Sequence, residues 1–378
     1  MSRTEPGVVD LVEIIPSYVD EVILRTVQDT HRAVSARAYG AVNAATGNAA
    51  TGPQRVHEVV SETVFAAVRV GVVGGVTIAG ALSGLMGHRG LTGPRSSVVH
   101  SALNGLLGDR FSHDASVLSI ALSVRTDGQD VALTDLADSF PEPTGKLVVF
   151  IHGLGEHDGH WSRGAAERGS TYPQALTRAG WTPVVLRVNT GLSLAENGTA
   201  LAGLLAELSD AWPTPVERIA LVGHSMGGLL ARAACAVGST TGEGWRGLVT
   251  DVVTLGTPHL GADLARVVGL GSRSLARFPE TAAFGRLLDV RSAGIVELSG
   301  GLGLEEPHDV RYRLVSGSLP GAWGTIFGDA MVRRGSATGR SARANLFPDA
   351  EVLHLEGVGH LDLLNHAEVE AALLRWLE

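Results

Sequence analysis

The chain has 378 residues, of which 44% are hydrophobic and 18% charged, and this composition is sufficient for a sizeable buried core. Its formal net charge is −9 and it has no basic run, which argues against nucleic acid as a partner. The single cysteine, Cys235, excludes an internal disulfide, and no residues have the spacing of a zinc site. The first ten residues lack the apolar region of a signal peptide, so we expect a cytoplasmic protein.

Residues 1–110 are predicted to form a helical region. Apolar side chains recur at helical spacing in 19–27, 56–64 and 98–107, and residues 45–53 have the composition of a linker. The uncharged segment 70–87 has the threshold length of a membrane span, but six of its eighteen residues are glycine, which weakens a helix. Small residues that permit close helix packing recur in it at Gly71, Gly75, Ala79 and Ser83. We therefore expect a buried or peripheral helical hairpin rather than a span, and a peripheral membrane contact through residues 56–87 stays open.

From residue 111 to residue 378 we expect an α/β domain. Its first element is a hairpin, with strands in 118–124 and 130–136 joined at Asp127–Gly128. Short apolar runs then alternate with helical stretches, which predicts a doubly wound, mainly parallel sheet whose ligands bind at the carboxyl ends of the strands. The strands are predicted at 146–153, 182–188, 217–225, 249–258, 310–317 and 350–357, and the helices at 172–179, 196–210, 226–237 and 366–377.

The sequence Gly-His-Ser-Met-Gly (223–227) lies between a predicted strand and a predicted helix. In that context a Gly-x-Ser-x-Gly motif places its serine on a sharp turn with an exposed hydroxyl group. A serine hydroxyl is a poor nucleophile, so it needs a base within hydrogen-bond reach and a carboxylate that orients the base. Ser225 is therefore a candidate nucleophile, and in sheets of this kind the acid and then the histidine follow it in the chain.

The base and the acid are each expected at the carboxyl end of a strand. His360 follows the last predicted strand and is the candidate base, with His354 and His366 as weaker alternatives. Asp329 lies in the long connection after the strand at 310–317 and is the candidate acid. Asp263, in the loop after the strand at 249–258, is the alternative acid.

An oxyanion hole in such a site uses the N–H group after the nucleophile and one from the loop after the first parallel strand. These groups are the N–H groups of Met226 and Leu154. The same loop also carries residues that could suggest a metal site, namely His152, His157, Asp158 and His160. Their spacing matches no zinc pattern, so solvated loop histidines are the preferred interpretation and no metal or cofactor is expected.

Residues 259–308 form a long insertion between two predicted strands. Several apolar residues in it have helical spacing, namely Phe284, Leu287, Leu288 and Ile295. This pattern is typical of a helical cap that lines an acyl pocket and acts as a lid, and equally of ordinary helix packing. Asn189, at the end of the strand at 182–188, either faces the site or caps the turn there.

Six segments, taken together in this order, resemble the α/β-hydrolase lipases and esterases, especially bacterial relatives of the PGAP1-like deacylases: VVFIHGLGEHDGHW, LRVNTGLSLAENG, LVGHSMGGLLAR, VVTLGTPHLGA, GDAMV and GVGHLDLL. The resemblance covers residues 145–378. It implies an α/β-hydrolase fold with Ser225 as nucleophile, Asp329 as acid and His360 as base, and with Leu154 and Met226 as oxyanion donors.

The function predicted on these grounds is hydrolysis of a carboxylic ester, small or lipid-like, through an acyl-enzyme and without a cofactor. An acyltransferase or a thioesterase would use the same three residues. A non-catalytic lipid-binding protein is the alternative from another class, and the presence of serine, acid and histidine argues against it.

Overall fold

The computed structural model describes residues 94–114, 118–242, 244–261, 293–298, 309–321, 329, 331–342 and 345–378, and scattered positions between 35 and 61. The chain divides into one compact unit of Met1–Gly93 with Arg266–Arg291 and another of Pro94–Ala265 with Ser292–Glu378. The predicted boundary at residue 110 falls inside a helix of the second unit. The segment 70–87, Asp263 and the apolar cap residues Phe284, Leu287 and Leu288 lie outside the described residues.

In the first unit, the described positions from 35 to 43 and from 51 to 61 are helical, with turn residues at 47, 49 and 50 between them. These turn residues lie in the predicted linker. The Asn43 side chain accepts a hydrogen bond from the Ala50 N–H (2.9 Å) and donates one to Gln54 (3.2 Å). No helix within the described part of the chain is long and apolar enough to cross a bilayer.

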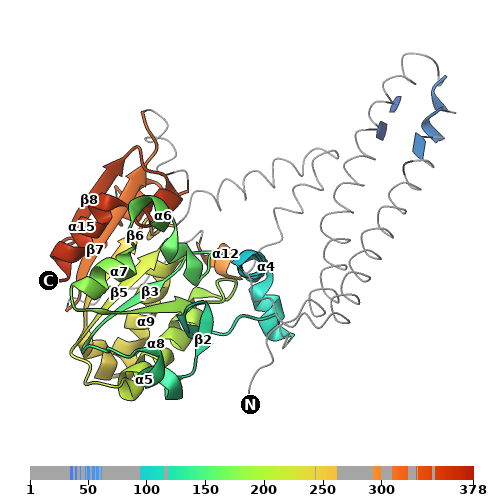
Figure 1. The fold of residues 1–378 in the computed structure, drawn as a ribbon. Helices are drawn as coiled ribbons and strands as arrows, with labels where there is room; N and C mark the ends of the chain where they lie inside the picture. The colour runs from blue at the N-terminus through green and yellow to red at the C-terminus, as the bar shows by residue number, and fades with distance from the viewer. Residues whose placement is uncertain are drawn as a thin grey trace. The chain divides into compact units, whose positions relative to one another are not determined.

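An eight-stranded sheet forms the centre of the second unit, in the order β2-β1-β4-β3-β5-β6-β7-β8 (Figure 1). The pairs β1–β2 and β1–β4 are antiparallel and all the other pairs are parallel, which confirms the predicted mainly parallel sheet. The strands are β1 (Ser123–Thr126), β2 (Gln129–Val131), β3 (Lys146–Ile151), β4 (Thr182–Arg187), β5 (Arg218–His224), β6 (Val249–Leu255), β7 (Arg311–Ser318) and β8 (Glu351–Glu356).

The predicted hairpin of β1 and β2 forms, but its strands are shorter than expected. The predicted strand at 130–136 ends at Val131, because the chain turns into η2 (Leu133–Asp135) and α5 (Leu136–Ser139). Asp127 and Gly128 have φ values of 50° and 73°, as the favoured two-residue hairpin turn requires. The prediction of strand at 118–122 is wrong, because a side chain of helix α4 (Pro94–His113) forms hydrogen bonds with backbone groups of this segment. Asn104 binds both the Leu118 carbonyl (2.8 Å) and the Ile120 N–H (2.9 Å).

The helices α7 (Tyr172–Arg178), α8 (Leu194–Ala211), α9 (Met226–Thr241) and α15 (Ala367–Trp376) correspond to the four predicted ones. Capping boxes begin α7 at Thr171 and α8 at Ser193, since each side chain accepts from an N–H three residues on. The shorter helical elements are η2 (Leu133–Asp135), α5 (Leu136–Ser139), η3 (Asp158–Ser162), α6 (Ala165–Arg168), η4 (Gly244–Leu248), α12 (Ala293–Leu298), α14 (Arg334–Ala337) and η5 (His360–Leu363).

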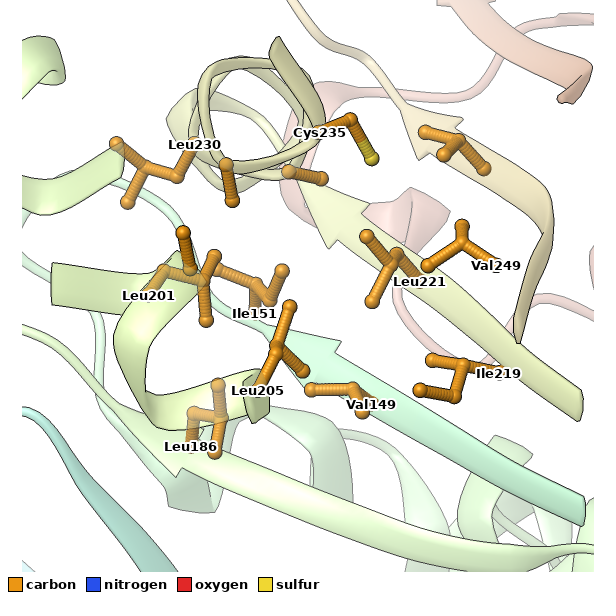
Figure 2. Packing of buried hydrophobic residues seen from close by; sticks show 14 of the residues in the cluster. Val149, Ile151, Leu186, Leu201, Leu205, Ile219, Leu221, Leu230, Cys235 and Val249 are labelled. Atoms are coloured by element: carbon orange, nitrogen blue, oxygen red, sulfur yellow. The ribbon is translucent and has the colours of Figure 1, made fainter. Parts of the chain in front are cut away.

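Alternate residues of the central strands bury against helices on opposite faces of the sheet. In β3, Leu147, Val149 and Ile151 belong to the cluster that contains α8 and α9. Val148 and Phe150 belong to the cluster that contains α7 and α15. Because all five side chains are fully buried, β3 is a central strand covered on both sides. Figure 2 shows the first of these clusters, with labelled side chains from the sheet and both helices: Val149, Ile151, Leu186, Leu201, Leu205, Ile219, Leu221, Leu230, Cys235 and Val249.

Candidate active site

Ser225 occupies a strained turn between β5 and α9. Its φ and ψ are 51° and −123°, a region that non-glycine residues rarely adopt and that recurs at functional sites. The Ser225 N–H donates to the Leu255 carbonyl (2.8 Å), which ties the turn to β6. A Cβ atom on Gly227 would overlap the Ile151 carbonyl, so this position must be glycine for α9 to approach β3.

His360 and Asp329 form a buried pair. The Nδ1 atom of His360 lies 2.8 Å from Oδ2 of Asp329 and donates to it. The other carboxylate oxygen, Oδ1, accepts from the N–H groups of Met331 (3.0 Å) and Val332 (2.8 Å). The Nε2 atom of His360 is buried and has no hydrogen-bond partner among the described residues. One ring nitrogen is thus fixed by a carboxylate, while the other remains available for proton exchange.

The strand register brings the candidate residues to one edge of the sheet. His224, directly before the serine, pairs with Leu255 of β6, and Gly223 pairs with Ile151 of β3. A Cβ atom on Gly153 would lie 2.9 Å from the Ser225 Cβ, and one on Gly256 would lie 3.0 Å from the His360 ring. The glycines that follow β3 and β6 therefore allow these two loops to approach the serine and the histidine closely.

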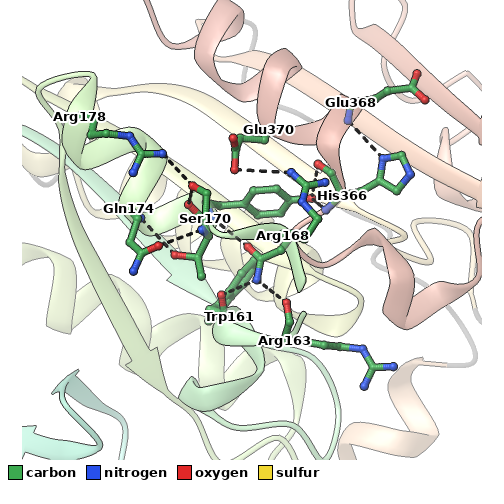
Figure 3. Close-up of polar contacts among 12 residues, drawn as sticks. Trp161, Arg163, Arg168, Ser170, Gln174, Arg178, His366, Glu368 and Glu370 are labelled. Carbon is green, nitrogen blue, oxygen red and sulfur yellow. Dashed lines mark hydrogen bonds and ion pairs between the residues drawn. The ribbon is translucent and has the colours of Figure 1, made fainter. Parts of the chain in front are cut away.

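The loop that carries His360 is fixed by a polar network with the segment after β3. Figure 3 shows contacts between residues of 161–178 and residues of 366–370. Asn365, with φ of 57°, donates to the carbonyls of Trp161 and Arg163 (2.8 Å each) and accepts from the Tyr172 N–H (2.8 Å). The Tyr172 hydroxyl also binds the Leu363 carbonyl (2.7 Å). These contacts lie within five residues of His360 and limit its movement.

The two predicted oxyanion donors lie in the turn after β3 and directly after the serine of the elbow. Met226 is the first residue of α9, where the helix N-terminus favours negative charge. Leu154 lies in the turn after β3, and the next N–H, that of Gly155, donates to Thr190 Oγ1 (3.0 Å). Within the described part of the chain, no backbone group accepts from the N–H of Leu154 or Met226.

His152 shapes this loop as a neutral side chain. Its Nδ1 lies 3.0 Å from the Gly153 carbonyl, and its Nε2 accepts from the Val188 N–H (3.0 Å). The expectation of a solvated loop histidine is therefore wrong for His152, whose ring is completely buried and whose pKa is lowered to about 4 by this burial. The ring therefore donates from Nδ1 and accepts at Nε2.

A buried ion pair that the sequence did not reveal, Glu156–His224, connects three parts of the site. Glu156 accepts from the Gly153 N–H (2.8 Å), and its carboxylate lies 2.8 Å from His224 Nδ1. His224 Nε2 lies 3.2 Å from the His360 carbonyl. Burial opposes charge on His224, but the Glu156 carboxylate outweighs it and raises the pKa of the imidazole. Burial also opposes charge on Glu156, yet His224 and the Gly153 N–H lower the pKa of that carboxyl to about 2. The oxyanion loop, the elbow and the histidine loop are thus joined by one pair of charges.

The alternative candidates have other contacts. His354 lies on β8 with its ring nitrogens next to Ser316 and Ser318, and His366 caps α15. In the loop after β3, His157 and His160 accept backbone hydrogen bonds from Gly159 and His157. Among the described residues, no group of three His, Cys, Asp or Glu side chains is arranged to hold a metal ion. Asn189 caps its turn by accepting from the Gly191 N–H (3.1 Å).

Comparisons with known proteins found one family model and several solved structures that are similar to this chain. The family model described as the PGAP1-like alpha/beta domain matches residues 190–270, which include Ser225. No curated protein matches the chain. A solved structure with a similar fold is the mature lipase BlEst2 of Bacillus licheniformis (20% identity, TM-score 0.44, 62% of this chain and 93% of that one). Another is the RedJ thioesterase of Streptomyces coelicolor (18% identity, TM-score 0.37, 66% of this chain and 96% of that one). A third is the naproxen esterase of Bacillus subtilis (14% identity, TM-score 0.35, 62% of this chain and 84% of that one).

The fold is that of the α/β hydrolases, as the resemblance in sequence implied. The eight-stranded, mainly parallel sheet with helices on both faces is the expected architecture.

Proposed function

We propose that the protein is a serine carboxylic-ester hydrolase that acts through an acyl-enzyme. The observation that carries this proposal is the buried His360–Asp329 pair, whose free Nε2 lies at the same sheet edge as a serine in a strained elbow. Carboxylate, imidazole and hydroxyl then act in the order Asp329, His360, Ser225, which is the arrangement that activates a serine.

In the first half of the reaction, the Ser225 hydroxyl attacks the carbonyl carbon of the ester. His360 Nε2 takes the hydroxyl proton, and Asp329 stabilises the imidazolium that forms. The N–H groups of Leu154 and Met226 bind the developing oxyanion, and each such donor contributes about 10²- to 10³-fold to turnover in enzymes of this type. The tetrahedral intermediate then collapses, His360 returns its proton to the leaving alcohol, and the acyl group remains on Ser225.

In the second half, water attacks the acyl-enzyme. His360 takes one proton from this water, and the same two N–H groups bind the new oxyanion. Collapse of this intermediate releases the carboxylic acid and returns the proton to Ser225. Since every step uses the same nitrogen of His360, its fixed orientation against Asp329 serves both halves.

The proposed substrate class is an acyl ester with an apolar acyl chain. This class follows from the resemblance of the six sequence segments to lipases, esterases and PGAP1-like deacylases. The predicted cap, residues 259–308, would line the acyl chain. If an alcohol took the place of water as acceptor, the same site would catalyse acyl transfer. If the substrate were a thioester, the same site would catalyse thioester hydrolysis.

The test uses the full chain with a series of p-nitrophenyl esters of increasing acyl length. Ser225→Ala should lower turnover by about 10⁶-fold, as expected for removal of a triad nucleophile. Ser209→Ala is the matched control, because Ser209 lies on α8 and donates to the Leu205 carbonyl of its own helix (2.8 Å). A Ser225→Ala variant that keeps a tenth of the activity would contradict the proposal. Product analysis with added alcohol, and with an acyl thioester, separates hydrolysis from the two alternatives.

A further inference from the structure

Helix α4, which precedes the sheet in the chain, approaches the loop of the predicted oxyanion donor closely at Gly105. A Cβ atom on Gly105 would lie 2.9 Å from the Cα atom of Gly155 and 3.0 Å from its nitrogen. Gly155 directly follows Leu154. Any displacement of this part of α4 therefore moves the peptide next to the Leu154 N–H, with no flexible side chain between them to absorb the change.

A second glycine contact places α4 against the neighbouring loop. A Cβ atom on Gly191 would overlap the Asn104 carbonyl and lie 2.6 Å from the Gly108 nitrogen. The Gly108 carbonyl accepts from the Asn189 side chain (3.1 Å). Thr190, between these two loop residues, is the acceptor for the Gly155 N–H. Gly155, directly after Leu154, and the 189–191 loop that accepts its N–H therefore both contact the same stretch of α4.

The position of α4 is itself fixed by buried polar groups. Asn104 is fully buried and uses its side chain to bind the His100 carbonyl (3.1 Å), the Leu118 carbonyl and the Ile120 N–H. His100 lies 2.7 Å from the same Leu118 carbonyl. Because buried polar groups are costly to separate, α4 cannot slide without breaking these bonds.

Helix α12 extends this support to the other oxyanion donor. The Ala293 N–H at its start donates to Asp109 of α4 (3.0 Å). A Cβ atom on Gly294 would lie 3.1 Å from the Met226 Cε and would overlap the Thr190 carbonyl. Glu297 accepts from the Leu194 N–H at the start of α8 (2.6 Å). The residue that supplies the second predicted donor is therefore covered by a helix bonded to α4.

We propose that α4 and α12 together (the brace, Pro94–His113 and Ala293–Leu298) position the oxyanion hole, and that Gly105 and Asp109 are positioning residues for hydrolysis. This inference rests on the proposed function, since it concerns the donors of that site. A displacement of about 1 Å in a catalytic group can reduce turnover by about 10²-fold, so a modest shift of the brace suffices. The region before the sheet then takes part in catalysis rather than only covering the domain.

The experiment measures kcat and KM for p-nitrophenyl butyrate in the full-length chain and its variants. Gly105→Ala should lower kcat at least tenfold and change KM by less than threefold, because the oxyanion forms only in the transition state. Asp109→Ala, which frees the start of α12, should lower kcat about threefold or more. The pH midpoint of kcat/KM should stay unchanged in both, because neither substitution alters a group that takes part in proton transfer.

Gly203→Ala is the matched control, because Gly203 lies on α8 and a Cβ atom there would meet nothing within 4 Å. Its kcat should equal that of the unaltered chain. Normal kcat in folded Gly105→Ala and Asp109→Ala, or a loss that appears in KM alone, would overturn the brace while leaving the proposed function intact. If Gly105→Ala does not fold, Asp109→Ala decides by the same criterion. An unaltered chain that hydrolyses no ester would instead overturn the proposed function and this inference with it.

Discussion

Replacing Asp329 with asparagine tests the proposed acid with almost no change of shape. Oδ1 of Asp329 accepts from two N–H groups, those of Met331 and Val332. Only an oxygen can accept these bonds, so the amide oxygen of an asparagine must take this position. The amide NH₂ group is then directed at His360 Nδ1, where the carboxylate oxygen Oδ2 lies at 2.8 Å in the unaltered chain.

The expected loss of turnover follows from this reversal of donor and acceptor at Nδ1 of His360. An NH₂ group opposite Nδ1 requires that His360 accept there, so the single proton of the neutral ring moves to Nε2. A ring that carries its proton on Nε2 cannot take the proton of Ser225. The same substitution in a serine protease triad lowers turnover by about 10⁴-fold for this reason, and we expect a loss of that order here.

The assay is p-nitrophenyl ester hydrolysis by Asp329→Asn, with thermal unfolding to verify the fold. Asp362→Asn is the matched control, because this exposed carboxylate is close to His360 in sequence but its nearest ion-pair partner is Arg163 at 3.9 Å. Asp263→Asn tests the alternative acid and should cost little. A tenth or more of the activity remaining in Asp329→Asn would refute the reasoning, and a large loss in Asp263→Asn would move the acid to that position.

Three further predictions concern stability. In urea titrations, the free energy of unfolding of Ser225→Gly should exceed that of Ser225→Ala by about 1 kcal/mol or more, because glycine adopts a positive φ without strain. Equal free energies would argue against a strained elbow. Glu156→Gln should lower the free energy of unfolding at pH 7 by about 2 kcal/mol, since His224 loses its charged partner. The exposed Glu142→Gln should stay within about 0.5 kcal/mol, and similar losses in both would contradict a special role for the buried pair. Burial lowers the pKa of His152 from 6.5 to about 4, so the unfolded chain binds a proton in this range that the folded chain does not. The free energy of unfolding should therefore fall by about 2 kcal/mol from this residue between pH 6 and 4.5, and a profile without such a loss in urea titrations would count against a neutral, buried ring.

The sheet could be predicted because its strands are short apolar runs separated by helical stretches. The strands β3 to β8 and the helices α7, α8, α9 and α15 all lie where these patterns indicated. The prediction failed at 118–122, where the apolar pattern suits a strand but Asn104 takes the backbone groups. A side chain fourteen residues away in the sequence thus decided the local structure, and no pattern within the segment indicates such a contact.

Within the site, the motif and its chain order predicted residues that the fold brings together. His360 and Asp329 are 31 residues apart in the chain and 2.8 Å apart in space. The Glu156–His224 pair could not be predicted, because Glu156 lies in the loop after β3 and His224 at the end of β5, and no sequence pattern indicates that they meet. The contact of α4 with Gly155 could not be predicted either. A glycine in an apolar helical pattern does not indicate which residue packs against it or how near that residue lies.

The most direct test of the central claim is the site of covalent reaction with a fluorophosphonate probe. After incubation of the full chain with the probe and digestion, mass spectrometry should find a single adduct, on Ser225 in the peptide that spans the elbow. The adduct should be absent in Ser225→Ala and should form far more slowly in Asp329→Asn. No adduct in the unaltered chain, or an adduct that persists in Ser225→Ala, would contradict the account.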